Sequence, residues 1–290
     1  MNKRLALGTV QLGVPYGVAN QQGQVPREEA AAIVAHARLA GLDTLDTAIA
    51  YGTSESRLGE IGVGEWRVVS KLPPLPADCP DVVEWVGEQV RGSLSRLGIT
   101  RLHGLLLHRA QDLLESRGEE LALALRVVKD SGQVGKTGVS VYGPDELAAL
   151  GPGAPLELVQ APFNVLDRRM ATSGWLARLH ARGVEVHTRS AFLQGLLLMS
   201  ASDRPATFKR WQTLWDHWHG WLDEHALSPV AACLAFALAQ PEIDRVIVGV
   251  DSLAQLKEIL GHAGERTATP PATLSSEEPL LINPSLWKPS

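Results

Sequence analysis

The sequence predicts a single-domain α/β protein folded as a (β/α)8 TIM barrel. Short apolar, strand-like runs alternate with amphipathic helical patterns along most of the 290-residue chain, which favours a parallel sheet covered by helices. Residues suited to acid–base chemistry follow several of these runs, and the carboxyl ends of barrel strands converge on one face. An open, doubly wound sheet is the alternative, but no Gly-x-Gly-x-x-Gly follows the first strand-like run.

Four strands and four helices are expected in the first half of the chain. The strands are predicted at Leu5–Val10, Leu42–Asp46, Trp66–Ser70 and Leu102–Leu107, and the helices from Pro26 to Gly41 and at Ser54–Ile61, Pro80–Leu97 and Glu119–Asp130. The helix at residues 80–97 has the clearest pattern, because Val83, Val86 and Val90 recur every three or four residues. The uninterrupted apolar run Leu105–Leu107 is typical of a strand covered on both faces.

The second half continues the same alternation. Its strands are predicted at Val134–Val141, Leu156–Ala161, Val184–His187 and Arg245–Val250, its helices at Asp145–Leu150, Met170–Ala181, Thr207–His225, Ser228–Ala239 and Ser252–His262, and an irregular segment from Arg189 to about Pro205. Trp211, Trp215 and Trp218 form a helical stripe, for which core packing is preferred over an aromatic wall of a sugar pocket. The proline-rich tail, residues 267–290, is expected to be irregular and either to cover the active-site mouth or to strap the barrel.

Composition and charge argue against several classes of function. The net charge is −5, which gives no basic surface for nucleic acid, so no such partner is expected. Cys79 and Cys233 are far apart, and no His, Asp and Glu cluster has a metal-ligand spacing, so neither a disulfide scaffold nor a metal enzyme is expected. The sequence has neither a signal-peptide core nor an apolar stretch that would span a membrane. We expect a cytoplasmic protein, either a monomer or a weak homodimer.

Four chemistry-bearing residues lie at or just after strand ends in the first half of the chain. Asp46 and Tyr51 belong to Leu-Asp-Thr-Ala-Ile-Ala-Tyr-Gly, Lys71 ends Trp-Arg-Val-Val-Ser-Lys, and His108 ends Leu-His-Gly-Leu-Leu-Leu-His. Tyrosine has a pKa near ~10, which a lysine ammonium lowers, and an aspartate paired with that lysine holds it in place. With a histidine sharing the proton or polarising a carbonyl, the group would protonate a carbonyl oxygen while hydride reaches its carbon.

Each of these residues alone also has a purely structural interpretation. An aspartate such as Asp46 more often caps the next helix, and a lysine such as Lys71 is usually solvated. His108 alone would more often be a buried histidine with satisfied hydrogen bonds, and Tyr51 before a glycine is typical of a turn. Four such residues at three successive strand ends favour a common site, because the structural interpretations would have to hold independently.

With these four residues in this order, the sequence resembles the aldo-keto reductases over nearly its whole length. The opening Leu-Gly-Thr-Val-Gln-Leu-Gly, which contains Gly8 and Thr9, is also similar to that family. The resemblance implies a (β/α)8 fold, a nicotinamide cofactor bound without a Rossmann fold, and reduction of aldehydes or ketones. Tyr51 would be the general acid, assisted by Lys71, Asp46 and His108.

The resemblance also implies a set of cofactor residues in the second half of the chain. Ser140 and Gln160 would hold the nicotinamide carboxamide, the Gln-Gly-Leu-Leu segment would form the pyrophosphate loop, and the region near the last strand would hold adenosine. The implied cofactor residues are Gly8, Thr9, Ser140, Gln160, Arg189, Ser190, Gln194, Gly195, Gly249, Ser252, Gln255 and Glu258.

The sequence departs from the family pattern at several of these positions. Val141 and Ile259 each replace a usual asparagine, and Arg189 replaces the aromatic residue that stacks on nicotinamide. A guanidinium can also stack on a ring, and its charge would disfavour oxidised nicotinamide or attract an anionic substrate. NADP(H) is favoured by the family, but Asp251 would repel its 2′-phosphate, so NAD(H) stays open. The cations that would bind that phosphate from the long loop are Arg204, Lys209 and Arg210.

Two functions from different classes follow. The leading hypothesis is an NAD(P)H-dependent reductase of a small or sugar-like carbonyl compound. The alternative is a nicotinamide-binding sensor or scaffold protein with little turnover, which the departures at Val141, Arg189 and Ile259 motivate. A cofactor-independent lyase or isomerase is disfavoured, because the four-residue group suits carbonyl protonation beside a hydride donor.

Overall fold

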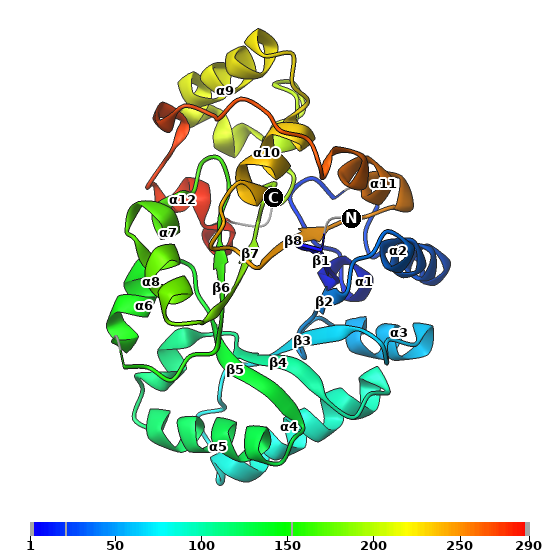
Figure 1. Ribbon diagram of the computed structural model, residues 1–290, viewed down its shortest axis with the longest axis vertical. Helices are drawn as coiled ribbons and strands as arrows, with labels where there is room; N and C mark the ends of the chain where they lie inside the picture. The colour runs from blue at the N-terminus through cyan, green and yellow to red at the C-terminus, as the bar shows by residue number, and fades with distance from the viewer. Residues whose placement is uncertain (1–2, 21, 152, 288–290) are drawn as a thin grey trace.

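Eight parallel strands close into a barrel in sequence order, because β1 pairs with both β2 and β8 (Figure 1). The structure is a computed structural model and describes residues 3–20, 22–151 and 153–287. The helices surround the strands as a ring, so the predicted (β/α)8 barrel is confirmed. No helix within the described residues is long and apolar enough to cross a membrane.

The strands differ from the predicted ones mainly at their ends. They are β1 Leu5–Gly8, β2 Thr44–Asp46, β3 Arg67–Leu72, β4 Leu102–Leu107, β5 Val134–Ser140, β6 Leu158–Pro162, β7 Glu185–Arg189 and β8 Arg245–Gly249. β1 is shorter than predicted because the chain turns into a short helix at Val10. β3 and β7 are longer, so Lys71 and Arg189 belong to strands rather than to the loops after them.

The helices follow the predicted order with a few divisions. They are α1 Val10–Gly13, α2 Arg27–Leu39, α3 Ser54–Ile61, α4 Val82–Leu97, α5 Gly118–Asp130, α6 Pro144–Leu150, α7 Arg169–Thr172, α8 Trp175–Ala181, α9 Gln212–Glu224, α10 Pro229–Leu238, α11 Leu253–His262 and α12 Pro279–Ile282, with 3-10 turns at Ala110–Leu113, Leu196–Leu198, Ala206–Trp211, Ala272–Leu274 and Pro284–Leu286. Gly174, with a φ of 76°, divides the helix predicted at residues 170–181 into α7 and α8. The helix predicted from residue 207 begins as a 3-10 turn.

Apolar side chains fill two regions of the fold. A large cluster lies between strands and helices and includes Trp215 and Trp218, which are fully buried, so core packing of the tryptophan stripe is confirmed. Val69, Leu106 and Leu158 form a second, small cluster. Since β4 and β6 are not hydrogen-bonded neighbours, their contact crosses the barrel interior. This apolar layer separates two polar ends of the barrel.

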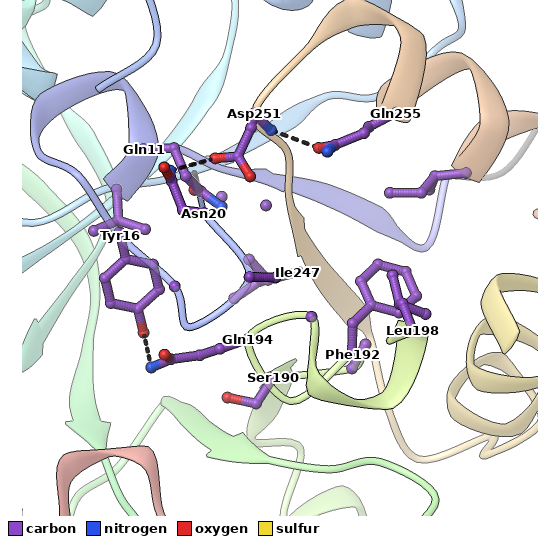
Figure 2. A pocket seen from close by; sticks show the side chains of 18 of the residues that line it. Gln11, Tyr16, Asn20, Ser190, Phe192, Gln194, Leu198, Ile247, Asp251 and Gln255 are labelled. Atoms are coloured by element: carbon purple, nitrogen blue, oxygen red, sulfur yellow. Dashed lines mark hydrogen bonds between the residues drawn. The ribbon is translucent and has the colours of Figure 1, made fainter. Parts of the chain in front are cut away.

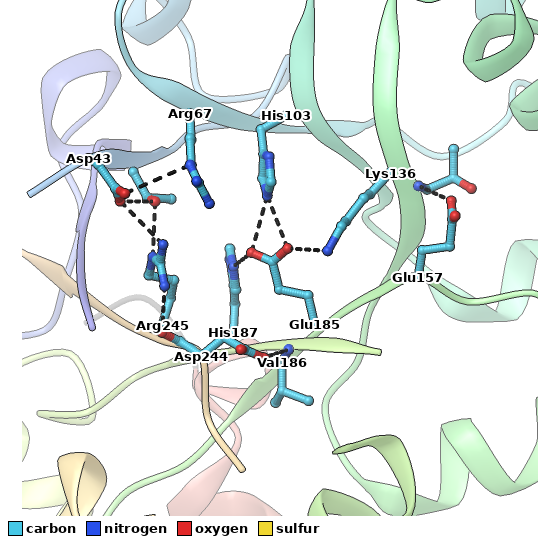
Figure 3. A network of polar contacts seen from close by, with 12 residues as sticks. Asp43, Arg67, His103, Lys136, Glu157, Glu185, Val186, His187, Asp244 and Arg245 are labelled. Carbon is cyan, nitrogen blue, oxygen red and sulfur yellow. Dashed lines mark hydrogen bonds and ion pairs between the residues drawn. The ribbon is translucent and has the colours of Figure 1, made fainter. Parts of the chain in front are cut away.

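A charged network lies at the amino-terminal end of the strands (Figure 3). The Glu185 carboxylate accepts hydrogen bonds from Lys136 Nζ at 2.6 Å, and lies 2.8 Å from His187 Nε2 and 3.1 Å from His103 Nε2. Burial alone would raise the pKa of Glu185, but its bonds to His103, His187 and Lys136 outweigh burial and hold that pKa well below its usual range. The polar and charged side chains at this end of the barrel interior therefore bind one another.

The tail packs against the loop after β6. Arg168 Nη2 donates to the carbonyls of Pro270 and Pro271 at 3.2 and 2.9 Å, and the Ser276 amide donates to the Leu166 carbonyl at 2.8 Å. None of the described tail residues lines the main pocket, and residues 288–290 of the predicted tail lie outside the described residues. A cover over the active-site mouth stays a prediction.

Candidate active site

The four predicted acid–base residues come together at the carboxyl ends of β2, β3 and β4. Lys71, which is only 1% exposed, donates to both Asp46 carboxylate oxygens at 2.9 and 2.7 Å and to the Thr47 carbonyl at 2.9 Å. Gln160 Nε2 on β6 also donates to Asp46, at 2.6 Å. Bonds from two strands therefore fix the carboxylate, and with it the buried ammonium.

Tyr51 lies over this ion pair in the loop between β2 and α3. Lys71 Nζ is 5.1 Å from the centre of its ring, and the His108 ring meets it edge-on at 5.9 Å. No hydrogen bond among the described residues joins the Tyr51 hydroxyl to Lys71 or His108. Tyr51 therefore contacts both residues through its ring. The turn requires Gly52, whose φ is 54°, and a Cβ on Gly13 would lie 1.8 Å from the Tyr51 carbonyl.

Burial sets the protonation states of these residues. It raises the pKa of Tyr51, and the Asp46 carboxylate raises it further. The expectation that Lys71 lowers this pKa is therefore wrong here, because Asp46 compensates the ammonium charge. Burial, followed by the Lys71 and Arg189 charges, lowers the pKa of His108 to about 4. At neutral pH the site presents a protonated phenol and a neutral imidazole.

A pocket of about 490 Å³ opens beside Tyr51 and extends between β1, β8, the loop after β7 and the start of α11. Asp46 and Tyr51 line one part of it. Asp251 lines another part, beside Asn20 (Figure 2). The predicted cofactor residues that line it are Gly8, Thr9, Arg189, Ser190, Gln194, Gly195, Gly249, Gln255 and Glu258. Segments far apart in the sequence therefore form one continuous groove.

Three predicted cofactor residues and two of the acid–base residues do not line this pocket. Gln160 is fully buried and holds Asp46, and the Ser140 hydroxyl lies 3.5 Å from its amide oxygen. Ser252 caps α11, accepting from the Gln255 amide at 3.2 Å. Lys71 and His108 are not among the lining residues either. This geometry therefore does not support direct contact between a ligand and Ser140, Gln160 or Ser252.

The loop after β7 has unusual backbone geometry. Ser190, Leu193 and Gln194 have φ values of 61°, 49° and 54°, in the left-handed region that side chains other than glycine rarely adopt. Gly195 follows with a φ of 87°, and a Cβ there would lie 2.4 Å from the Ala19 Cβ. Since such conformations cost free energy and cluster at ligand sites, this segment is a candidate ligand-binding loop.

The sequence did not indicate several of the lining residues, among them Tyr16, Asn20 and Gln11. Tyr16 accepts a hydrogen bond from Gln194 Nε2 at 3.0 Å, and Asn20 Nδ2 donates to Asp251 at 2.9 Å (Figure 2). Gln11 lines the pocket, and its Oε1 is buried without a hydrogen-bond partner. Gln11 belongs to the opening motif, which was a usable signal, whereas Tyr16 and Asn20 stand in a loop with no recognisable pattern.

Comparison with known proteins decides the family. The model of the aldo/keto reductase family matches residues 4–267. This chain belongs to the aldo/keto reductase family. The curated aldo-keto reductase YhdN of Bacillus subtilis is 25% identical over 146 residues, which cover 46% of this chain and 43% of that relative. The match therefore spans less than half the length of the curated relative.

Solved structures of other aldo/keto reductases share the fold. A Pseudomonas aeruginosa protein assigned to this family is 25% identical, with a TM-score of 0.66 over 90% of this chain and 89% of that one. Aldo-keto reductase AKR11C1 of Bacillus halodurans, in its holo form, is 19% identical, with a TM-score of 0.73 over 92% of this chain and 88% of that one. Nicotinamide cofactors serve this family.

The pocket of this aldo/keto reductase fits such a cofactor. The unpartnered Gln11 Oε1 is an acceptor suited to a ligand N–H group. A Cβ on Gly249 would lie 2.5 Å from Gln11 Nε2, and one on Gly8 would lie 3.0 Å from Ile247. Glycine on β1 and β8 therefore makes room for the Gln11 and Ile247 side chains, which line the pocket.

The cations expected from the long loop do not line the pocket of this aldo/keto reductase. Arg204 is 6% exposed, stacks on the Trp215 ring at 4.1 Å and lies 2.8 Å from His219 Nε2. Lys209 and Arg210 are likewise absent from the lining. Among the lining residues that the structure describes, Arg189 is the only lysine or arginine.

Proposed function

We propose that this protein reduces the carbonyl group of a small aldehyde or ketone with a nicotinamide cofactor. The observation that carries the proposal is Tyr51, a protonated phenol that lines the pocket above the buried Asp46–Lys71 pair. When bound, the reduced cofactor supplies hydride to the carbonyl carbon. The residues of this chain then have to provide a proton to the carbonyl oxygen and control the charge that develops.

Each of the four residues has a separate role in this proposal. Tyr51 donates its proton to the carbonyl oxygen and becomes a phenolate, while Lys71, paired with Asp46, packs against its ring and keeps the phenol in position. Asp46 holds Lys71 in place, and Gln160 in turn holds Asp46. Neutral His108, which does not line the pocket, meets the Tyr51 ring edge-on and holds the phenol in position.

We also propose that this enzyme prefers NAD(H). The family resemblance favours NADP(H), whose additional 2′-phosphate needs a cationic partner. Asp251 and Glu258 line the pocket near α11, and no lysine or arginine of the described residues lines it there. An additional phosphate close to these carboxylates would be repelled.

The variant Tyr51→Phe tests the proposed role of the phenol. It removes the proton donor but keeps the ring, so we expect kcat for a panel of aldehydes and ketones to fall by at least about a hundredfold. The dissociation constant of the reduced cofactor, measured by fluorescence titration, should change by less than about threefold. Tyr142→Phe is the matched control, because it removes a phenol hydroxyl from a residue that does not line the pocket and keeps the ring on which Arg189 stacks.

Retained turnover in Tyr51→Phe would refute the mechanism. Cofactor binding by the wild-type protein without turnover of any carbonyl compound would favour the alternative, a nicotinamide-binding sensor or scaffold protein.

A further inference from the structure

The guanidinium of Arg189 is a cation without an acidic partner. Arg189 ends β7 and stacks on the Tyr142 ring, with 4.5 Å from the guanidinium carbon to the ring centre. Nη2 donates to the Val141 carbonyl at 3.1 Å, and Nη1 makes only a long contact of 3.5 Å with the Ser190 hydroxyl. No carboxylate of the described residues forms an ion pair with it. Lys71, the other cation of the site, is neutralised by Asp46.

This cation shares the pocket with the proposed proton donor. Arg189 and Tyr51 both line it, and the Arg189 charge lowers the pKa of His108 and of Tyr51, although burial is the larger effect on both. His108 is neutral at pH 7, so Arg189 alone leaves the proton-donating part of the pocket with an unpaired positive charge. An unpaired charge in a partly buried site is best compensated by an anionic ligand.

The stacking also fixes how an anion would meet the guanidinium. Tyr142 covers one face and the Val141 carbonyl holds one edge. No hydrogen bond among the described residues uses Nε, and Nη1 is held only weakly. Nη2 keeps a second N–H, which together with the neighbouring N–H of Nε or Nη1 forms the parallel pair of donors that a carboxylate accepts.

We propose that Arg189 selects carbonyl substrates that carry a carboxylate. This inference rests on the proposed reductase function and names its substrate class. The carboxylate pairs with the guanidinium while the carbonyl lies at Tyr51. In the reaction the carbonyl carbon gains the hydride and its oxygen gains the Tyr51 proton, and the carboxylate is unchanged. A cofactor phosphate is the other anion within the same pocket, and the experiment separates the two sources.

The test compares 4-formylbenzoate with its neutral counterpart 4-formylbenzamide in the cofactor-saturated enzyme. We expect wild-type kcat/KM to be at least about tenfold higher for the carboxylate. In Arg189→Gln the ratio of the two kcat/KM values should fall to about one, because the ratio cancels effects on the cofactor or on proton donation. Arg178→Gln is the matched control, since Arg178 also stacks on an aromatic ring, at 4.4 Å, but is exposed and does not line the pocket.

Two results would overturn the proposal. One is a wild-type ratio near one. The other is an equal loss for both aldehydes in Arg189→Gln with a matching rise in the cofactor dissociation constant, which would assign the anion to the cofactor.

A binding measurement separates this proposal from the proposed function. If neither aldehyde is reduced, calorimetric titration of the cofactor-bound protein with benzoate and benzamide still tests Arg189. Tighter benzoate binding that is lost in Arg189→Gln would support the carboxylate site even though the reductase function had failed, and equal binding of both compounds would refute it.

Discussion

Lys71 and Asp46 neutralise each other at the centre of the site, and this pairing determines how Tyr51 behaves. A lone ammonium beside the ring would favour the phenolate. Because the ammonium is bound by two carboxylate oxygens and a carbonyl, burial dominates and the pKa of the phenol rises. Tyr51 is therefore well suited to hold a proton until a substrate oxygen takes it.

These protonation states predict a flat pH profile for carbonyl reduction. The pKa of His108 is lowered to about 4, and that of Tyr51 is raised above its ordinary value. His108 therefore gains its proton only in acid, and Tyr51 loses its proton only in strong alkali. We expect kcat/KM to be constant from about pH 5.5 to about pH 9, measured with one substrate at saturating cofactor. A step near pH 6.5 that disappears in His108→Gln would contradict this prediction.

Asp251 provides a test of cofactor preference at a single side chain. It lines the pocket, and burial raises its pKa while the Asn20 hydrogen bond opposes that rise. In Asp251→Asn we expect kcat/KM with NADPH, relative to NADH, to increase by roughly tenfold, which corresponds to about 1.4 kcal/mol of relieved repulsion. Asp130→Asn, an equal charge change at the end of α5, should leave the ratio unchanged. An unchanged ratio in both variants would show that Asp251 does not discriminate.

Sequence reasoning located strand-end residues better than it assigned side-chain contacts. Asp46 and Lys71 could be placed because strands carry them to the same end of the barrel. Gln160 also lies on a strand, but local sequence patterns do not reveal that its amide donates to Asp46 rather than pointing into the pocket. Tyr16 and Asn20 depend on the path of a loop, which short-range patterns do not determine.

The turn between α9 and α10 offers a test at the level of one element. The Leu227 amide donates to the Leu222 carbonyl and the Ala226 amide to the Asp223 carbonyl, which is a Schellman motif. Ala226 occupies the position that glycine usually fills, with a φ of 51°. We expect Ala226→Gly to increase the free energy of unfolding by about 1 kcal/mol and Tm by roughly 2 °C.

A matched change in a regular helix provides the control for Ala226. Ala177 is exposed within α8, where glycine lowers helix stability. Ala177→Gly should decrease the free energy of unfolding by about 1 kcal/mol. Opposite signs for the two variants, measured by urea unfolding, would confirm the assignment, whereas destabilisation by both would contradict it.

Element boundaries illustrate the same limit of sequence reasoning. The helix predicted at residues 170–181 is interrupted at Gly174. The left-handed backbone of Gly174 ends α7, and α8 begins at the next residue. The chain after Gly8 forms a helical turn rather than extending β1, as α1 packs its Gly13 against the Tyr51 carbonyl. Both outcomes depend on neighbours distant in sequence.

Across the whole molecule, the charged network at the amino-terminal end of the barrel contributes to stability, far from the pocket. Replacing Glu185 by Gln would leave Lys136 and His187 without their carboxylate, so we expect a loss of about 3 kcal/mol in the free energy of unfolding at pH 7. Because the pKa of Glu185 is held low in the folded state, this difference should shrink as pH falls below the ordinary glutamate pKa.

A surface glutamate provides the control for this network. Glu157 pairs with Lys129, and both side chains are more than a third exposed, so Glu157→Gln should cost no more than about 1 kcal/mol. Equal losses of unfolding free energy for the two variants, measured by urea unfolding, would show that the buried network stabilises the fold no more than a surface ion pair does. The barrel itself was predictable from alternating patterns, but this network was not, because His103, Lys136 and Glu185 stand on three separate strands.

The pairing of Leu5 with Val246 has a consequence for synthesis of the protein on the ribosome. The first strand gains β2 as a partner early, but its second partner, β8, follows about 240 residues after β1, or roughly 12 to 50 seconds later at ordinary elongation rates. During that time an incomplete, curved sheet exposes two unpaired edges, which are templates for aggregation. We therefore expect nascent chains truncated before β8 to be captured by chaperones that recognise open strands, and full-length chains to escape them.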